Sequence, residues 1–499
     1  MIHRRLSLTR RPWLLLTILL LSSIGLRAAE GKRPNVLFAI ADDWGWPHAG
    51  AYGCEWVKTP NFDRIAREGV LFKHAFTNNP KCTPCRGSIL TGRNSWQNEE
   101  GMVHFSLMPK KWPVYPDLLE ADGYHIGLTG KGWGPGDFKS TGWTRNPAGP
   151  SYDKIKNDPP AGGMGKNDYA ANFETFLAAR KPGQPFCFWY GASEPHRGYE
   201  QGSGARAGKK PGAVTLPPYY PNSPIIRNDF LDYALEAEWF DQHLGRMIAA
   251  LEAAGELENT IIIVTSDHGA PFPRMKGHIY EDGFHIPLAV RFGSKVKAGR
   301  TLEDFINVRD FAPTIFELCG VTIPESISGK SFAPALLSDK DGWVDANRNR
   351  MIVGKERHDV GRPNDAGYPV RAIRTPEWLY VRNYESERWP AGNPETGYRE
   401  VDDGPTKFFL LADFDRHYQL SFGKRAAEEL YDLKKDPACV DNLAAKSEHA
   451  ATVQSLRAEM EQSLTKDGDP RMSGKGDVFD TYPYLGASKH KYETWLKNQ

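Results

Sequence analysis

Four apolar runs that each end in polar residues constrain the fold of this chain more than any other feature. The runs cover residues 36–41, 125–129, 186–190 and 260–265. Unbroken apolar runs of this length are typical of strands that are buried on both faces of a parallel sheet. Helical spacing of apolar residues predicts helices between them, over 84–91, 115–121 and 229–257. We therefore predict an α/β fold, with a parallel-rich central sheet sandwiched by helices.

The residues that follow these runs predict a ligand site. Asp42 and Asp43 follow the first run, and Asp267 and His268 follow the last. Ligands of open parallel sheets bind in the crevice outside the carboxyl ends of the strands. Carboxylates that share a crevice repel one another unless a cation neutralises them, and oxygen-rich ligation suits Ca²⁺ or Mg²⁺. An imidazole ligand from His268 would also suit Mn²⁺ or Zn²⁺.

The N-terminus predicts export. Arginines at positions 4, 5, 10 and 11 precede an apolar stretch over 14–26, and Ala28-Ala29 offers a cleavage point. This pattern is typical of a signal peptide, which we place at residues 1–28. A membrane anchor is the alternative, but the run is short for a span. We expect a periplasmic or extracellular protein with no stable membrane insertion after signal removal.

The sequence pattern changes near residue 345, where the alternation of strand and helix signals gives way to a polar, irregular segment. We predict a catalytic domain over 29–345 and a smaller C-terminal α+β subdomain over 346–499. Short strands at 370–373, 378–384 and 429–433 predict an antiparallel sheet, and 446–464 predicts a helix. The polar segment 348–364 predicts irregular structure, and the tail after 465 predicts a loop.

Charge and cysteine content exclude several classes of protein. The 63 basic and 62 acidic residues give a net charge of +1, which argues against a nucleic-acid binder that relies on bulk charge. The six cysteines do not cluster as in a small disulfide scaffold. Cys82 and Cys85 could form a redox pair or half of a zinc site, but no second close pair completes such a site.

The segment around Cys82 carries the strongest functional signal. Cys82-Thr83-Pro84-Cys85-Arg86, with Thr91-Gly92 behind it, has the form C-x-P-x-R followed by T-G. It resembles the maturation signature of the type I sulfatases, in which the first cysteine is converted to formylglycine. Further segments resemble that family in the expected order: 34–43, 59–63, 127–131, 266–269, 280–283, 311–314 and 429–437. Over 33–443 the chain resembles a formylglycine-dependent sulfatase of the alkaline phosphatase superfamily, and 194–197 and 270–273 are most similar to heparan N-sulfatases.

The resemblance implies a hydrolase of sulfate esters or sulfamates on sulfated carbohydrates. It implies formylglycine from Cys82, a formylglycine-generating maturation enzyme as a partner, and a divalent metal, with Ca²⁺ first and Mg²⁺ or Mn²⁺ as alternatives. The implied metal ligands are Asp42, Asp43, Cys82, Asp267 and His268.

The resemblance also implies roles for residues around the sulfate. Arg86 would hold the hydrated aldehyde. Lys131 and Lys276 would stabilise charge on the sulfate oxygens. His196 would bind the sulfate and protonate the leaving group, and Arg197 would contact a substrate carboxylate or a second sulfate.

One segment departs from the family. The family usually has Lys-x-His where this chain has Lys131-Gly132-Trp133. Either another residue replaces the missing histidine, or Trp133 forms a wall that faces the sugar. His104 and His285 are weaker candidates for the pocket. We expect the Gly- and Pro-rich loops 143–167 and 198–228 to form the substrate rim.

Two other functions remain open from the sequence. One is a phosphonate or phosphodiester hydrolase of the same superfamily, which can share formylglycine and an Asp-His metal pair. The other is a catalytically inactive glycan-binding relative, which only the missing histidine supports.

Overall fold

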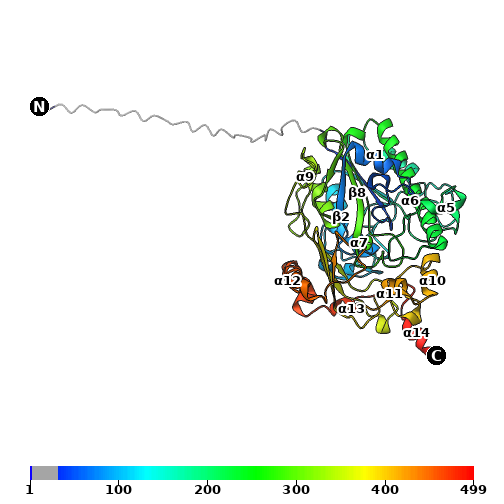
Figure 1. Cartoon of the computed structure of the whole chain (residues 1–499). Helices are drawn as coiled ribbons and strands as arrows, with labels where there is room; N and C mark the ends of the chain where they lie inside the picture. Colours follow the sequence, from blue (N-terminus) through cyan, green and yellow to red (C-terminus); the bar gives the residue numbers. More distant parts are fainter. Residues whose placement is uncertain (3–31) are drawn as a thin grey trace.

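The computed structural model describes residues 1–2 and 32–499 of the chain (Figure 1). The predicted signal peptide falls almost entirely on residues 3–31, outside the described residues. Across the described part, no helix is both long enough and apolar enough to span a bilayer.

The central sheet has eight strands in the order β10-β2-β8-β7-β1-β6-β4, with β9 beside β2. Strand β8 is antiparallel to both of its neighbours, and the other pairings are parallel. The parallel-rich sheet is therefore confirmed. The strands are β1 (Asn35–Ala41), β2 (Val70–Phe76), β4 (His125–Gly130), β6 (Phe186–Gly191), β7 (Thr260–Ser266), β8 (His285–Arg291), β9 (Arg300–Leu302) and β10 (Ile306–Asn307).

Helices cover both faces of this sheet, because its strands are apolar on both sides. In β1, Leu37 and Ala39 pack into one hydrophobic core, while Val36 and Phe38 pack into another. The first core is closed by α1 (Pro60–Glu68), α4 (Tyr169–Ala179) and α6 (Pro224–Ala253). The second is closed by α2 (Cys82–Thr91), α3 (Tyr115–Ala121) and α8 (Phe311–Cys319). The predicted sandwich is confirmed.

Helix boundaries differ from prediction in two informative places. Helix α6 begins at Pro224 and not at 229, because the Ser223 side chain caps the Ile225 N–H and proline suits the first helical turn. Helix α2 begins at Cys82, two residues before the predicted start. Cys82 therefore lies within the first turn, where backbone N–H groups have no helical partner.

The C-terminal part forms a second, antiparallel sheet, as predicted. Its strands are β11 (Met351–Lys355), β12 (Val370–Arg374), β13 (Trp378–Asn383) and β14 (Glu428–Asp432). Helix α12 (Ala450–Lys466) packs on one face, and the other face packs against residues of the first sheet region such as Phe76 and Phe284. Apolar contacts thus join the two sheets into one body (Figure 1).

Two C-terminal expectations were wrong. The segment 348–364 contains β11, whose short apolar run of three residues stands in a polar stretch and which pairs with β12 over its whole length. The tail after 465 contains α13 (Val478–Thr481) and α14 (Lys491–Lys497), both too short to show a helical period. The proposed domain boundary at 345 stays a prediction.

A buried ion cluster fixes the second sheet to the tail. Arg371 on β12 is fully buried and lies 2.8 Å from Glu356 and 2.5 Å from Asp469. Arg471 pairs with the same glutamate at 2.5 Å. Because each buried charge has a partner of opposite sign, removing one member leaves the others uncompensated.

We predict that Arg371→Ala lowers the free energy of unfolding by about 3–5 kcal/mol, since it leaves Asp469 buried without its cation and Glu356 with Arg471 alone. Urea unfolding followed by tryptophan fluorescence measures the effect. Arg416→Ala is the control, because Arg416 and Asp441 form an exposed pair at 3.4 Å and its loss should leave the midpoint unchanged. Equal midpoints for Arg371→Ala and the parent protein would contradict this assignment.

Candidate active site

The carboxyl ends of three adjacent parallel strands bring the predicted residues together. Strand β1 lies between β6 and β7, so Asp42 and Asp43 lie between the residues that follow those two strands. Asp267 and His268 come from the β7 side, and His196 comes from the β6 side. The structure therefore brings these strand-end residues together in one cluster.

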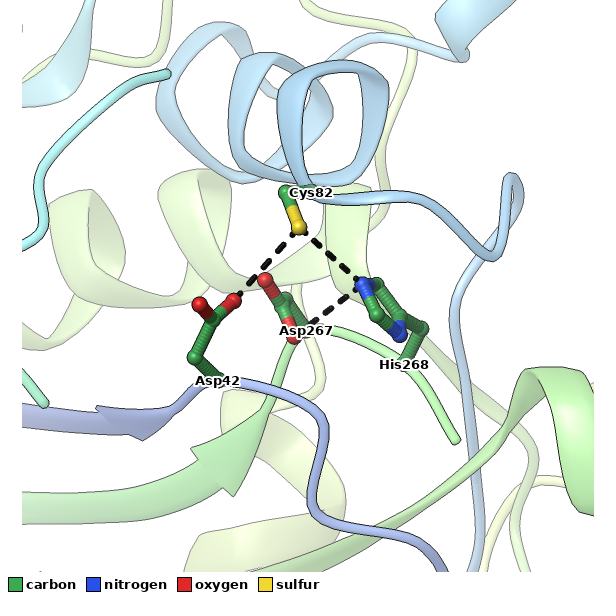
Figure 2. A group of neighbouring side chains, drawn as sticks. All are labelled: Asp42, Cys82, Asp267 and His268. Carbon is green, nitrogen blue, oxygen red and sulfur yellow. Dashed lines mark hydrogen bonds and ion pairs between the residues drawn. The ribbon is translucent and has the colours of Figure 1, made fainter. Parts of the chain in front are cut away.

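Cys82 points into this cluster from the first turn of α2 (Figure 2). Its Sγ lies 3.5 Å from Asp42 Oδ1 and 3.3 Å from His268 Nε2. Burial, together with the charge of Asp42, raises the pKa of the Cys82 thiol far above its usual value. Cys85 packs into the hydrophobic core on the sheet side of α2 instead. Only Cys82 of this pair can therefore face a ligand.

The aspartates of the cluster are almost completely buried. Asp42 is 2% exposed, and Asp43 and Asp267 are fully buried. Asp43 has a backbone φ of 73°, a left-handed conformation that aspartate tolerates better than most residues, and its N–H donates to Asp267 Oδ1 at 3.1 Å. This turn lets two consecutive aspartates and Asp267 share one small volume.

Three cations oppose these carboxylates, of which Arg86 and Lys276 are buried and Lys131 is partly exposed. Arg86 lies 2.9 Å from Asp267 and 3.3 Å from Asp42. Lys131 lies 2.6 Å from Asp42, and Lys276 lies 2.7 Å from Asp43. Burial raises the pKa of Asp42, but Lys131 and Arg86 outweigh it and hold that pKa well below its usual range. Burial raises the pKa of Asp267, and there the cations do not compensate fully.

The donor set fits a hard divalent cation. Ligand atoms of Asp42, Cys82, Asp267 and His268 lie within 4.8 Å of one another. Asp43 Oδ1 is buried without a hydrogen-bond partner among the described residues, 3.2 Å from His268 Nε2. A buried, unpartnered carboxylate oxygen beside an imidazole nitrogen is what a cation site requires.

His196 and Arg197 follow β6 and differ in how free their side chains are to bind a ligand. The His196 side chain is 38% exposed, and its Nε2 lies 3.9 Å from Asp43. Its Nδ1 donates to the Arg197 carbonyl oxygen at 3.0 Å, which leaves Nε2 facing the aspartates. Arg197 forms two 2.8 Å bonds to Asp229 and is nearly buried. The structure thus gives Arg197 a protein partner that the sequence did not indicate.

A pocket of about 340 Å³ opens onto Cys82, Lys131, His196 and Lys276. A second hollow of about 230 Å³ shares Lys131 and His196 with it. The rim expectation was partly wrong: loop 143–167 contributes Gly163 and Gly165, but loop 198–228 contributes nothing to either hollow. The outer wall instead comes from four separate segments, with residues His104, Phe105, Asp359, Val360, Arg399, Asp402, Tyr484, Ala487 and Ser488.

The sequence did not indicate two carboxylates of this wall, Asp359 and Asp402, and one of its two interpretations of the Lys131-Gly132-Trp133 segment was wrong. Asp402 lies 2.9 Å from Lys276, and Asp359 lies 2.6 Å from Lys81. Both come from polar stretches without a motif. Trp133 is not a sugar-facing wall, because it is 3% exposed and packs behind α2. His285, a weaker pocket candidate, stacks on Trp46 in a separate, larger cavity of about 650 Å³ that contains none of the other predicted site residues.

A sequence model of the Sulfatase family matches residues 34–321, more than half of the chain. The chain belongs to the sulfatase family. A second model, described as N-sulphoglucosamine sulphohydrolase, C-terminal, matches residues 274–389. The resemblance to sulfatases of the heparan N-sulfatase type is therefore confirmed, and the protein is a sulfuric ester hydrolase.

Individual relatives agree with this family. An ulvan-active sulfatase of Formosa agariphila is 26% identical, over 89% of this chain and 77% of the relative. Human N-sulphoglucosamine sulphohydrolase is 27% identical, over 92% of this chain and 95% of the relative.

Solved structures share the alkaline phosphatase-like fold. The protein yidJ of Bacteroides fragilis superposes with a TM-score of 0.66 at 21% identity, over 90% of this chain and 99% of that one. A phosphonate monoester hydrolase of Silicibacter pomeroyi gives a TM-score of 0.63 at 17% identity, over 88% and 97%. Because a phosphonate hydrolase superposes about as well, the fold alone does not decide the substrate.

We predict that Cys82, while it is still a thiol, resists alkylation in the folded protein. The thiolate is the reactive form, and burial keeps Cys82 protonated. Cys54, which is only half-buried, should react with iodoacetamide at least about tenfold faster at pH 8, as measured by peptide mass spectrometry. In urea the two rates should converge. Faster reaction of Cys82 in the folded state would show that its thiol is activated.

Proposed function

We propose that this chain hydrolyses a sulfate ester or sulfamate on a sulfated carbohydrate, with formylglycine made from Cys82 and a divalent metal. The observation that carries the proposal is the position of Cys82, which lies in contact with both Asp42 and His268 inside the buried carboxylate cluster. A nucleophile precursor and a cation-binding donor set share one volume there. Neither feature alone would support this chemistry.

The surroundings of Cys82 favour its conversion. As a thiol it is a poor nucleophile here, because burial keeps it protonated. When Cys82 is converted, the hydrated aldehyde supplies one hydroxyl to attack sulfur and a second that later allows sulfate to leave. A formylglycine-generating enzyme is the maturation partner in this proposal, and export through the N-terminal signal is part of it.

Asp42, Asp43, Asp267 and His268 would hold the metal together with residue 82. The cation would neutralise sulfate oxygens and acidify a hydroxyl. Carboxylate oxygens predominate in the donor set, so we propose Ca²⁺, with Mg²⁺ or Mn²⁺ as alternatives.

The remaining groups act on the sulfate from the protein side. Lys131 and Lys276 both line the pocket beside Cys82, so they oppose charge that spreads over the sulfate oxygens. The first turn of α2 adds backbone N–H groups that favour an anion. Arg86 holds Asp42 and Asp267 in place and orients residue 82.

His196 is the proton donor for the leaving group in this proposal. It is the more exposed of the pocket histidines, and its Nε2 is free of the hydrogen bond that Nδ1 makes, so an imidazole N–H can reach a leaving group in the pocket. Arg197 stabilises the position of His196, because its ion pair with Asp229 fixes the loop that carries both residues. We therefore assign Arg197 to positioning, although a contact with a substrate anion was the sequence expectation.

Two observations support a sulfated carbohydrate as the substrate: the charges of the pocket and the names of the relatives. Lys81, Lys131 and Lys276 line one small hollow, which suits an anionic group. Two relatives are named for ulvan and for N-sulphoglucosamine, which places both sulfate esters and sulfamates in the proposal. Comparing rates on aryl sulfate and aryl phosphonate esters tests the alternative phosphonate hydrolase, and turnover of any sulfated sugar excludes the inactive relative.

We predict that coexpression with a formylglycine-generating enzyme converts Cys82 and leaves Cys85 unchanged. Trypsin cleaves after Lys81 and after Arg86, and it therefore releases the peptide 82–86. Its mass should show one thiol replaced by an aldehyde. Cys82→Ala should abolish sulfatase activity, because no nucleophile remains. Cys85→Ala is the matched control and should keep most of it. Sulfatase activity in a protein whose Cys82 is still a thiol would contradict the role of Cys82 as the nucleophile precursor.

We predict that Ca²⁺ stabilises the protein through the aspartate cluster. At a hundred times its Kd the ion should add about 2.7 kcal/mol of stability, because only the folded state assembles the site. Thermal unfolding with Ca²⁺ and with EDTA measures this. Asp43→Asn should remove most of the Ca²⁺-dependent rise in Tm, while the exposed Asp339→Asn should keep all of it. A full rise in Asp43→Asn would place the ion elsewhere.

A further inference from the structure

His104 lies in the active-site pocket and has no role in the mechanism above. It is 4% exposed and lines the same hollow as Cys82, His196 and Lys276. The next residue, Phe105, has a left-handed backbone with a φ of 51°, which is uncommon for an aromatic residue. The chain thus adopts an unfavourable turn beside a buried histidine at the pocket.

Asp359 holds the imidazole in one orientation. Its Oδ1 accepts from His104 Nδ1 at 3.0 Å and from the Tyr484 hydroxyl at 3.3 Å. Its Oδ2 lies 2.6 Å from Lys81, the residue directly before Cys82. Three segments far apart in the sequence therefore meet on one carboxylate. Because a carboxylate can only accept, the hydrogen of His104 lies on Nδ1, and Nε2 carries the lone pair.

That second ring nitrogen is unsatisfied. Across residues 32–499, His104 Nε2 is buried and has no hydrogen-bond partner. A buried polar atom without a partner costs free energy. Among the described residues, six histidines have a buried ring nitrogen without a partner, and His104 is the one of these that lines the Cys82 pocket. Burial also lowers the pKa of His104 to about 4, so the ring is neutral at pH 7. The pocket therefore holds a fixed, neutral hydrogen-bond acceptor.

An acceptor of this kind does not suit the sulfate group itself. Sulfate oxygens are also acceptors, so a neutral Nε2 would face them without a hydrogen between. The lysines of the pocket supply the donors and charge that sulfate needs. A sugar hydroxyl, by contrast, is a donor that a fixed acceptor can bind.

We propose that His104, oriented by Asp359, accepts a hydrogen bond from a sugar hydroxyl near the reacting sulfate. It is a positioning and specificity residue that selects sugar over other sulfate carriers. This inference rests on the proposed function, because it requires a sulfated carbohydrate in the pocket.

Calorimetric titration of the full chain in a Cys82→Ala background, which prevents turnover, tests the inference. The probes are glucosamine 6-O-sulfate, N-sulfoglucosamine and inorganic sulfate. His104→Ala should weaken binding of the sugar that the parent binds by about tenfold, the range of one hydrogen bond. Binding of inorganic sulfate should change less than about twofold, since sulfate makes no use of an acceptor.

Two further variants keep the test sharp. His104→Gln retains an acceptor near the Nε2 position and should recover most of the affinity for the sugar, which also guards against a folding defect in His104→Ala. His417→Ala alters a histidine on α11 (Arg416–Phe422), outside the pocket, and should have no effect.

Each outcome decides between the hypotheses. Equal weakening of sugar and sulfate, or no weakening of either, would overturn the role of His104 and leave the proposed function intact. A parent protein that binds inorganic sulfate but neither sugar would overturn the proposed substrate class, and this inference with it.

Discussion

The electrostatic balance of one buried cluster is the constraint on which the rest of this structure depends. Asp42, Asp43 and Asp267 are nearly inaccessible to water, and charges of one sign cannot share such a volume without opposing charges. Arg86, Lys131 and Lys276 supply them at distances of 2.6 to 3.3 Å. In the proposed function, the carboxylates of this arrangement bind a divalent ion and its cations bind an anionic substrate.

The geometry of the first sheet makes this balance possible. Parallel strands deliver their carboxyl ends to one edge, and β1 sits between β6 and β7 with its two aspartates in the middle. Helix α2 then brings Cys82 over that edge (Figure 2). Arg86 on the same helix pairs with Asp42 and Asp267. Since both faces of the sheet are covered by helices, the strand ends are held rigidly, and the charged side chains keep fixed positions.

The C-terminal region completes the pocket and does more than cover the sheet. Asp402 gives Lys276 a second partner, and Asp359 connects Lys81 with His104 and Tyr484. Buried ion pairs around Arg371 hold the tail that carries Tyr484. In our proposal, specificity for the sugar depends on this part of the chain, which is remote in sequence from Cys82. The fold alone does not set the substrate, since sulfatases and a phosphonate hydrolase share it.

The sequence by itself determined the layers of the fold, the strand ends and the Cys82 motif, because these depend on local apolar patterns and contiguous residues. It also indicated Asp42, Asp43, Asp267 and His268, since parallel strands must place their carboxyl ends together. It misjudged β11, the tail helices and Trp133, which are decided by pairing and burial. Only the tertiary structure could select Asp359 and Asp402, because both lie in polar stretches with no period of their own and each meets a lysine across a long sequence separation. It also separated the two weaker histidine candidates, since His104 lines the Cys82 pocket and His285 lies in another cavity.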